Sequence, residues 1–293
     1  MSKYTFKQFQ AEFPNDEACL AKLMEIRFGG TELTCPGCRQ HAAFHPMGKR
    51  KAYACQDCGH HVYPCANTIF HKSSTKLSHW FFAMYLMTST RHGVAAKEIE
   101  RQIGVTYKTA WRMCHELRKL MATADYEGPL GGHVEIDETH VGGHQTHEDR
   151  ADKGSNKTIV MGMVSRDGAL RAGPIPADTK AVMEPIVYRN VEPGSTISTD
   201  MHKGYEDLSA DYRHEAVDHN VKEYVRGVHH TNTIEGHWSL FKRAVAGTHV
   251  LISSKHMWKY VSEFSYRRNF RFSHRVMFAR LARAVSLPRL AET

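Results

Sequence analysis

The sequence predicts an α/β protein in which a mixed-sheet domain follows two small N-terminal modules. Three observations predict it: strand and helix patterns alternate from residue 133 onward, two Cys-x-x-Cys pairs lie within residues 31–66, and helical patterns fill residues 72–122. At 293 residues, the chain is long enough for one large domain and such modules. The expected parts are an N-terminal helical segment (1–30), a cysteine-rich module (31–71), a helical module (72–122), the α/β domain (133–250) and a basic helical tail (251–293).

Charge is distributed unevenly along the chain. The net charge of +8 divides into +2 over residues 1–71, +6 over 72–122, −9 over 123–235 and +9 over 236–293. An acidic middle between basic flanks suits a site that collects metal cations while its flanks bind phosphates; a solvated surface that is merely lopsided is the alternative. No apolar run reaches the roughly 18 residues that cross a bilayer, and no signal peptide is evident. We therefore expect a cytoplasmic protein with no membrane partner.

The cysteine pairs predict a metal site. Cys35-Pro-Gly-Cys38 and Cys55-Gln-Asp-Cys58 are separated by sixteen residues, a spacing typical of a structural Zn²⁺ site in which four thiolates leave no open position. The other cysteines, Cys19, Cys65 and Cys114, are not needed as ligands. Such a ribbon is either a scaffold or a contact for nucleic acid or protein, and the basic residues between its pairs (Lys49, Arg50 and Lys51) favour DNA mildly.

The helical module has the form of a helix-turn-helix. Residues 94–104 and 105–121 are two helical patterns, Gly104 allows the turn between them, and Thr106 can cap the second helix. A preceding apolar stretch, 77–87, can pack beneath the pair. In such a motif the first residues of the second helix contact DNA, which makes Tyr107, Lys108, Thr109 and Arg112 the candidates. An ordinary helical hairpin with a charged outer face is the alternative.

The α/β domain follows a linker at 123–132. Residues 158–165 and 169–175 are two strands joined by a turn that contains Asp167-Gly168, a hairpin signal. Further strands are expected at 133–141, 195–199 and 214–217, and helices at 179–188, 231–245 and 257–285. This order predicts a mixed α/β layer structure.

Three acidic residues lie on separate elements of this domain. Asp137 belongs to the alternating strand pattern VEIDETHVGG, Asp200 ends a second strand, and Glu235 lies in a helix. Hard divalent cations such as Mg²⁺ or Mn²⁺ prefer carboxylate oxygens, and two such ions about 4 Å apart can activate an attacking oxygen and stabilise a leaving one. The three acids are therefore candidate ligands of a two-metal site. Lys242, two helical turns after Glu235, would face the DNA backbone beside it.

Several neighbours of these acids are alternatives. Glu138 is expected on the strand face opposite Asp137, Glu135 on the same face but deeper, and Asn232 one turn before Glu235. A role of Asn232 in the metal site stays open, as does one for the nearby histidines, His202, His229, His230 and His237. In the tail, aromatic and basic residues alternate; the aromatics suit an amphipathic helix that closes the core, and the arginine density favours phosphate contact.

The ribbon cysteines and three motifs, IDETHVGG (136–143), TDMHKGY (199–205) and HTNTIEGHWSLFKR (230–243), resemble the bacterial insertion-sequence transposases of the ISXO2-like type. This branch of the DDE superfamily has a ribonuclease-H-like core, and the resemblance spans roughly residues 15–275. It implies that Asp137, Asp200 and Glu235 bind the metal and that Lys242 is their companion base. It also implies binding of terminal inverted repeats, cleavage at the element ends, and transfer of the 3′-hydroxyls into target DNA.

The sequence thus predicts a nucleoid-associated DNA transposase that uses Mg²⁺ or Mn²⁺ for catalysis and Zn²⁺ for structure. Because two element ends are joined in one event, a homodimer or higher oligomer on DNA is expected. Two other functions stay open: a structure-selective, ribonuclease-H-type nuclease, and a DNA-binding regulator (a catalytically silent transposase being a variant of it). Beyond the helix-turn-helix, the candidates for DNA contact are Lys242, Arg243, Arg267, Arg268 and Arg271.

Overall fold

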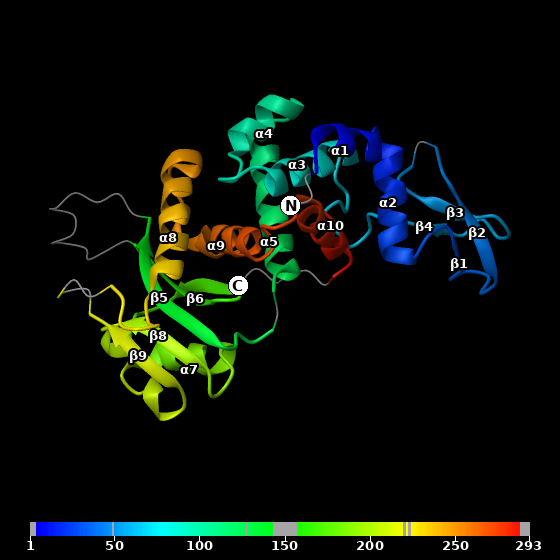
Figure 1. Ribbon diagram of the computed structural model, residues 1–293. Coiled ribbons are helices and arrows are strands. Elements are labelled where there is room, and N and C mark those ends of the chain that lie inside the picture. The colour runs from blue at the N-terminus through cyan, green and yellow to red at the C-terminus, as the bar shows by residue number, and fades with distance from the viewer. Residues whose placement is uncertain are drawn as a thin grey trace. The chain divides into compact units, whose positions relative to one another are not determined.

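The computed structural model describes residues 4–48, 50–126, 128–142, 157–218, 221 and 224–287. The chain forms two compact units (Figure 1). The first comprises residues 1–91, 96–124 and 272–293, and the second comprises residues 92–95 and 125–271. Within the described ranges, no helix has both the length and the apolar character needed to span a membrane.

The helices of the first unit share an aromatic core. Helix α1 (Phe6–Glu12) begins with a capping box made by Thr5 and Gln8, and α2 (Asp16–Phe28) is capped by Asn15. Both lie within residues 1–30, where a helical segment is expected. Buried rings on α1, α3 (Leu77–Ser89) and α10 (His274–Arg283) pack against one another, and the predicted helix over 77–87 is confirmed.

Four short antiparallel strands form the cysteine-rich module, in the order β1-β2-β3-β4. They are β1 (Glu32–Thr34), β2 (His41–Pro46), β3 (Tyr53–Cys55) and β4 (His61–Val62). The apolar core of this module is small, with Phe44, Tyr53 and Val62 as its larger members. A module of this size needs an additional cross-link to remain folded.

Two helices and a tight turn follow, as expected. Helix α4 (Ala96–Ile103) ends at Gly104, whose φ of +68° is in the left-handed region that favours glycine. Helix α5 (Tyr107–Ala124) begins after Thr106, whose hydroxyl accepts a hydrogen bond from the Thr109 amide at 3.3 Å. Both the turn and the cap are those expected from the sequence. A DNA-binding role for the pair stays a prediction.

The second unit contains a five-stranded mixed sheet in the order β7-β6-β5-β8-β9. Its strands are β5 (His133–Val141), β6 (Thr158–Ser165), β7 (Leu170–Ile175), β8 (Thr196–Asp200) and β9 (Arg213–Val217). Strands β5, β6 and β7 are antiparallel neighbours, whereas β8 runs parallel to both β5 and β9. The expected mixed α/β layer architecture is confirmed, with β5 as the central strand.

Helices cover both faces of this sheet (Figure 1). The core on one face includes residues of α8 (Asn232–Ala244) and α9 (Ser254–Asn269), and the core on the other includes residues of α7 (Lys180–Asn190). Helix α8 approaches β6 closely at Gly162, where an added Cβ would lie 2.5 Å from the Trp238 ring. Any larger residue at this position would push α8 away from the sheet.

The expectation of one continuous helix over 257–285 is wrong. Helix α9 ends at Asn269, and α10 begins only at His274, in the first unit. The break has a structural cause, because the Asn269 side chain bonds to both backbone groups of Leu170 on β7. It accepts from the Leu170 amide at 2.8 Å and donates to the Leu170 carbonyl at 2.9 Å. Ser273 then caps α10 by accepting from the Val276 amide.

Candidate metal centres

The four ribbon cysteines converge on one point. The sulfur atoms of Cys35, Cys38, Cys55 and Cys58 all lie within 4.8 Å of one another, and the Cys35 and Cys58 sulfurs are 3.6 Å apart. Four sulfurs at the Zn–S distance of about 2.3 Å in a tetrahedron are about 3.8 Å from each other. The cluster therefore fits Zn²⁺. The four thiolates would fill its coordination shell, which leaves the ion only a structural role.

Each cysteine pair lies in the same kind of turn. The Cys35 amide donates to the Gln40 carbonyl and the Arg39 amide to the Cys35 carbonyl; Cys55, Gly59 and His60 repeat this pattern. The Gly37 amide also donates to the Cys35 sulfur at 3.3 Å. Although desolvation opposes it, donation from the Cys38 and Gly37 amides lowers the pKa of the Cys35 thiol to about 6. The first turn thus favours the thiolate form of Cys35, whereas hydrogen bonds with the neighbouring thiols raise the pKa of Cys38 and burial raises that of Cys55.

The remaining cysteines and the ribbon's basic residues lie elsewhere. Cys19, Cys65 and Cys114 are buried and are not members of the cluster. The Lys51 ammonium donates to the carbonyls of Ser73 and Thr75, so it supports the backbone of the first unit. Lys49 lies outside the described residues.

Strand pairing brings the first two acids together in the second unit. Strands β5 and β8 are parallel, and Glu135 pairs with Ser198. Two residues further along each strand are Asp137 and Asp200, which therefore lie side by side on the same face of the sheet. Asp137 is also opposite Gly162 of β6, whose close contact is with α8. Both carboxylates consequently face the α8 side.

Glu235 approaches this face from the first turn of α8. Its Oε1 accepts a hydrogen bond from the Thr231 hydroxyl at 2.6 Å. All three acids are partly buried. Burial, reinforced by the carboxylates of Glu138, Asp200 and Glu235, raises the pKa of Asp137 to about 7. The three predicted acids thus share one electrostatic environment, and a divalent cation placed there would relieve their repulsion.

The acids surround a region wider than a single-ion site. Among the described residues, the cysteine cluster is the only group of three or more possible ligands whose donor atoms all lie within 4.8 Å of one another. The oxygens of Asp137, Asp200 and Glu235 are therefore more widely spaced than those of a closed site. Mutual repulsion without a cation and the bond from Thr231 to Glu235 favour this spacing. Carboxylates spaced in this way would suit two divalent ions, which need no common contact point.

The neighbouring acid Glu138 lies on the opposite face, as expected. Its Oε2 accepts a hydrogen bond at 2.7 Å from the hydroxyl of Tyr205, a residue of the core on the α7 side. Burial raises the pKa of Glu138. The negative charge of Glu138 contributes to the raised pKa of Asp137, but its carboxylate bonds to Tyr205 on the opposite face of the sheet.

Glu135 has a larger role than the sequence indicated. Its side chain is fully buried, and its carboxylate accepts hydrogen bonds from the amides of Thr233 and Ile234 and from the Thr233 hydroxyl. The backbone of the first turn of α8 is thereby anchored to β5. Asn232 is the first residue of this helix and is exposed.

One candidate histidine, His229, shares a polar chain with Ser198 and with His133, which the sequence had not singled out. The Ser198 hydroxyl lies 2.7 Å from His133 Nε2 and 2.9 Å from His229 Nδ1. Burial, together with the charge of Arg166, lowers the pKa of His133 to about 4, so this imidazole is neutral near pH 7. Alternation in β5 places His133 on the face of Glu135 and Asp137, a signal that the sequence already contained.

Two further candidate histidines, His202 and His237, lie outside this polar chain. His202 accepts a hydrogen bond from the Gly204 amide, and its own amide donates to Asp200 Oδ1 at 3.0 Å. His237 is buried in α8, and burial lowers its pKa to about 3. His202 thus shapes the turn after Asp200, and His237 is a neutral core residue.

The basic candidates of the second unit differ in accessibility. Lys242 and Arg243 are exposed near the end of α8. Arg271 is partly buried and donates to the carbonyl of Arg268. Arg267 is only 8% exposed, and its guanidinium bonds to the buried Glu263 carboxylate at 2.9–3.0 Å. This internal ion pair argues against direct contact between Arg267 and a phosphate.

The start of α5 presents polar and aromatic side chains to solvent. Tyr107 is 50% exposed, and Lys108 and Arg112 are exposed as well, whereas Thr109 is partly buried beside the cap. Trp111, which the sequence did not single out, is 37% exposed and stacks on His115 with ring centroids 3.8 Å apart. A tryptophan on the solvent side of an amphipathic helix is the signal that could have identified it.

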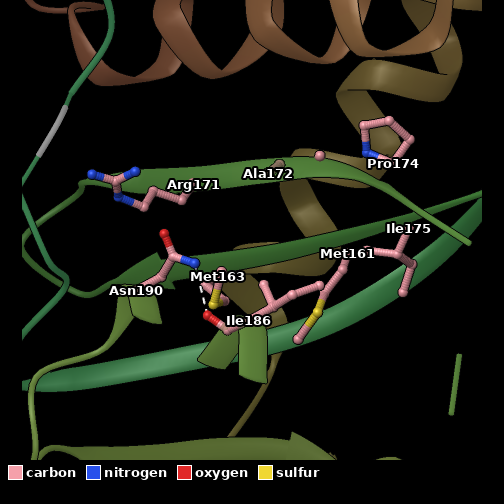
Figure 2. Close-up of a pocket in the computed structure, with 9 residues that line it drawn as sticks. Met161, Met163, Arg171, Ala172, Pro174, Ile175, Ile186 and Asn190 are labelled. Carbon is pink, nitrogen blue, oxygen red and sulfur yellow. Dashed lines mark hydrogen bonds between the residues drawn. The ribbon is translucent and has the colours of Figure 1, made fainter. Parts of the chain in front are cut away.

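A cavity of about 230 Å³ lies on the α7 face of the five-stranded sheet, opposite the face of the three acids (Figure 2). Met161, Met163 and Ile186 line its floor, Arg171 and Pro174 belong to the edge strand β7, and Asn190 donates to the Ile186 carbonyl at 2.7 Å. Met161 and Met163 belong to the core on the α7 side. The cavity is therefore separated by the sheet from the acids.

The raised pKa of Asp137 predicts a pH-dependent stability in the metal-free protein. Between the ordinary pKa of 3.8 and about 7, native Asp137 binds more protons than the unfolded chain, so the free energy of unfolding falls as the pH rises through this window. Relative to wild type, Asp137→Asn should gain no stability near pH 4 and about 5 °C or more in Tm at pH 8. Thermal unfolding in a chelator at both pH values measures this; an equal difference at both would contradict it.

Comparison with known proteins identifies two domains in this chain. An ISXO2-like transposase domain matches residues 129–269, which include Asp137, Asp200 and Glu235, and a transposase zinc-ribbon domain matches residues 14–61, which include the four cysteines. A protein from the transposable element ISH50 of Halobacterium salinarum is 28% identical over 254 residues, covering 80% of this chain and 84% of the relative. The two domain matches together cover nearly two thirds of the chain. The chain therefore carries a transposase zinc-ribbon domain followed by an ISXO2-like transposase domain.

Proposed function

We propose that this transposase cleaves DNA at the ends of its element and joins the freed 3′-hydroxyls to target DNA. The observation that carries the proposal is the convergence of Asp137, Asp200 and Glu235 on the α8 face of a sheet whose family domain is that of transposases. Water attacks the scissile phosphodiester and releases a 3′-hydroxyl and a 5′-phosphate. The 3′-hydroxyl then attacks a target phosphodiester, so one bond forms as another breaks in each step.

The three acids are the proposed ligands of Mg²⁺ or Mn²⁺. Bound divalent ions supply Lewis-acid stabilisation of the attacking and leaving oxygens. Asp137 and Asp200, on adjacent strands, hold one side of the site, and Glu235 holds the other from α8. The raised pKa of Asp137 means that ion binding near neutral pH also displaces a proton from its carboxyl group.

Residues of both units provide the proposed DNA contacts. Lys242 follows Glu235 by seven residues on α8, which places both on one side of the helix, and Arg243 lies beside it. Arg268 and Arg271 lie near the carboxyl end of α9, in the same unit. In the first unit, Tyr107, Lys108, Thr109 and Arg112 begin the proposed recognition helix. Specific binding of terminal repeats belongs to that helix, the ribbon or both, and two bound ends require a dimer or higher oligomer.

A joining assay tests the proposal. Purified protein, end DNA and Mn²⁺ should give both nicked ends and products in which the 3′ end is covalently joined to a target plasmid. Glu235→Gln, which keeps the size of the side chain and removes its charge, should lose both products. Wild-type protein that nicks intact ends but never joins pre-cut ends to the target would instead identify a nuclease. Normal products from Glu235→Gln would contradict the assignment of this residue.

A further inference from the structure

The first turn of α8 depends on a carboxylate from another element. Thr231, at the position before this helix, makes no side-chain cap, although the first amides of any helix need acceptors. Glu135 of β5 supplies them: its Oε2 accepts from the Thr233 amide at 2.8 Å and from the Ile234 amide at 3.2 Å, and its Oε1 accepts from the Thr233 hydroxyl at 2.8 Å. A negative charge at a helix N-terminus is also favoured by the helix dipole.

Arg166 holds the same carboxylate. Its Nε donates to Glu135 Oε1 at 3.3 Å, and His230 Nδ1 lies 3.1 Å from that oxygen without a hydrogen bond to it. Arg166 also donates to the Val228 carbonyl at 2.6 Å, so it fixes the chain that leads into α8. With its carboxylate 0% exposed and bonded by four groups, Glu135 has one well-defined orientation.

This anchor connects the elements that carry two of the metal-binding acids. Asp137 is two residues after Glu135 on the same strand face, about 7 Å further along β5. Glu235 is two residues after Thr233 and next to Ile234. Any shift of the helix start relative to β5 therefore changes the separation between the Asp137 and Glu235 carboxylates.

We infer that Glu135 is a positioning residue that sets the spacing between Asp137 and Glu235, and thereby the affinity of the site for divalent ions. It does so by capping α8 from β5, with Arg166 holding its carboxylate in place. The inference rests on the proposed function, because it takes the two acids as metal ligands. Removal of a group that hydrogen-bonds to and orients a metal ligand typically lowers metal affinity or activity by about 10–100-fold.

The first unit offers a matched control for a purely structural cap. Asp16 accepts hydrogen bonds from the amides of Leu77 and Ser78, at 3.0 and 2.9 Å, and from the Ser78 hydroxyl at 2.6 Å. It thus caps α3 with the same set of groups that Glu135 uses on α8. Loss of either cap should lower stability. Only the Glu135 cap joins the strand that carries Asp137 to the helix that carries Glu235.

The test compares full-length Glu135→Gln, Asp16→Asn and wild type, all loaded with zinc. Thermal unfolding reports stability, and Mn²⁺ binding without DNA, followed by electron paramagnetic resonance of the free ion, reports affinity. Both variants should lower Tm. Glu135→Gln should weaken Mn²⁺ binding about tenfold or more, with Asp16→Asn within about twofold of wild type. Half-maximal cleavage should shift to higher Mn²⁺ concentration by the same factor.

A milder variant covers the case in which Glu135→Gln does not fold. Thr233→Val removes only the hydroxyl that donates to Glu135 and should weaken Mn²⁺ binding about threefold. Wild-type affinity in the folded Glu135 variant, or an equal loss in Asp16→Asn, would overturn the inference and leave the proposed metal site standing. Wild-type protein that binds no Mn²⁺ outside the ribbon would remove that site and the inference with it.

Discussion

Asp137→Asn is expected to reduce DNA cleavage and strand joining by about a thousandfold or more, while the protein stays folded and binds DNA. Asp137 lies on the central strand, next to Asp200 and within electrostatic reach of Glu235. Loss of its charge removes the proposed ligand that both ions share, and a barrier increase of about 4 kcal/mol corresponds to this factor. Single-turnover cleavage of labelled end DNA measures it, with binding followed separately by fluorescence anisotropy.

Glu138→Gln is the matched control, because it removes the adjacent carboxylate of the same strand. Glu138 faces the α7 side and accepts its hydrogen bond from Tyr205, so its loss should leave the cleavage rate within about tenfold of wild type. A thousandfold loss in Glu138→Gln, or normal cleavage by Asp137→Asn, would show that the wrong strand face has been assigned to the reaction.

Removal of zinc is expected to unfold the cysteine-rich module. Its strands are two to six residues long, and few of its larger apolar side chains are buried, so packing alone cannot offset the entropy of ordering them. Binding of a structural zinc ion contributes about 10–16 kcal/mol in small modules. Cys55→Ser should lose the zinc measured by elemental analysis, and hydrogen exchange should show loss of protection across residues 31–66.

Cys65→Ser provides the comparison for this experiment. Cys65 is buried close to the ribbon in sequence but does not belong to the sulfur cluster, so this variant should keep one zinc ion and native protection. A ribbon that remains protected in Cys55→Ser without zinc would contradict the structural role of the metal.

Local patterns predicted the elements of the second unit well. Strand patterns predicted β5 and β6 with the bounds that the structure has, β6 with the help of the Asp-Gly hairpin signal. Alternation in β5 placed Glu138 opposite Asp137, which depends only on the two-residue period of a strand. The sequence could not show which strands pair: the parallel alignment of β5 with β8, which brings Asp137 beside Asp200, joins segments about sixty residues apart.

Side-chain roles that depend on distant partners were predicted less well. Glu135 is 31 residues from Arg166 and 98 from Thr233, so no local pattern could distinguish an anchor from a spare acid. Arg267 is different, since its partner Glu263 lies one helical turn earlier and the i,i+4 spacing was visible. The break after Asn269 had a local signal too, in the cap Ser273.

The central claim is that Asp137, Asp200 and Glu235 together bind a pair of divalent ions. Anomalous X-ray scattering from Mn²⁺ in crystals of the protein with cleaved end DNA tests it most directly. The account predicts two manganese peaks about 4 Å apart, with Asp137 in contact with both and Asp200 and Glu235 in contact with one each. Manganese bound elsewhere in the second unit, with these three carboxylates free of metal, would contradict it.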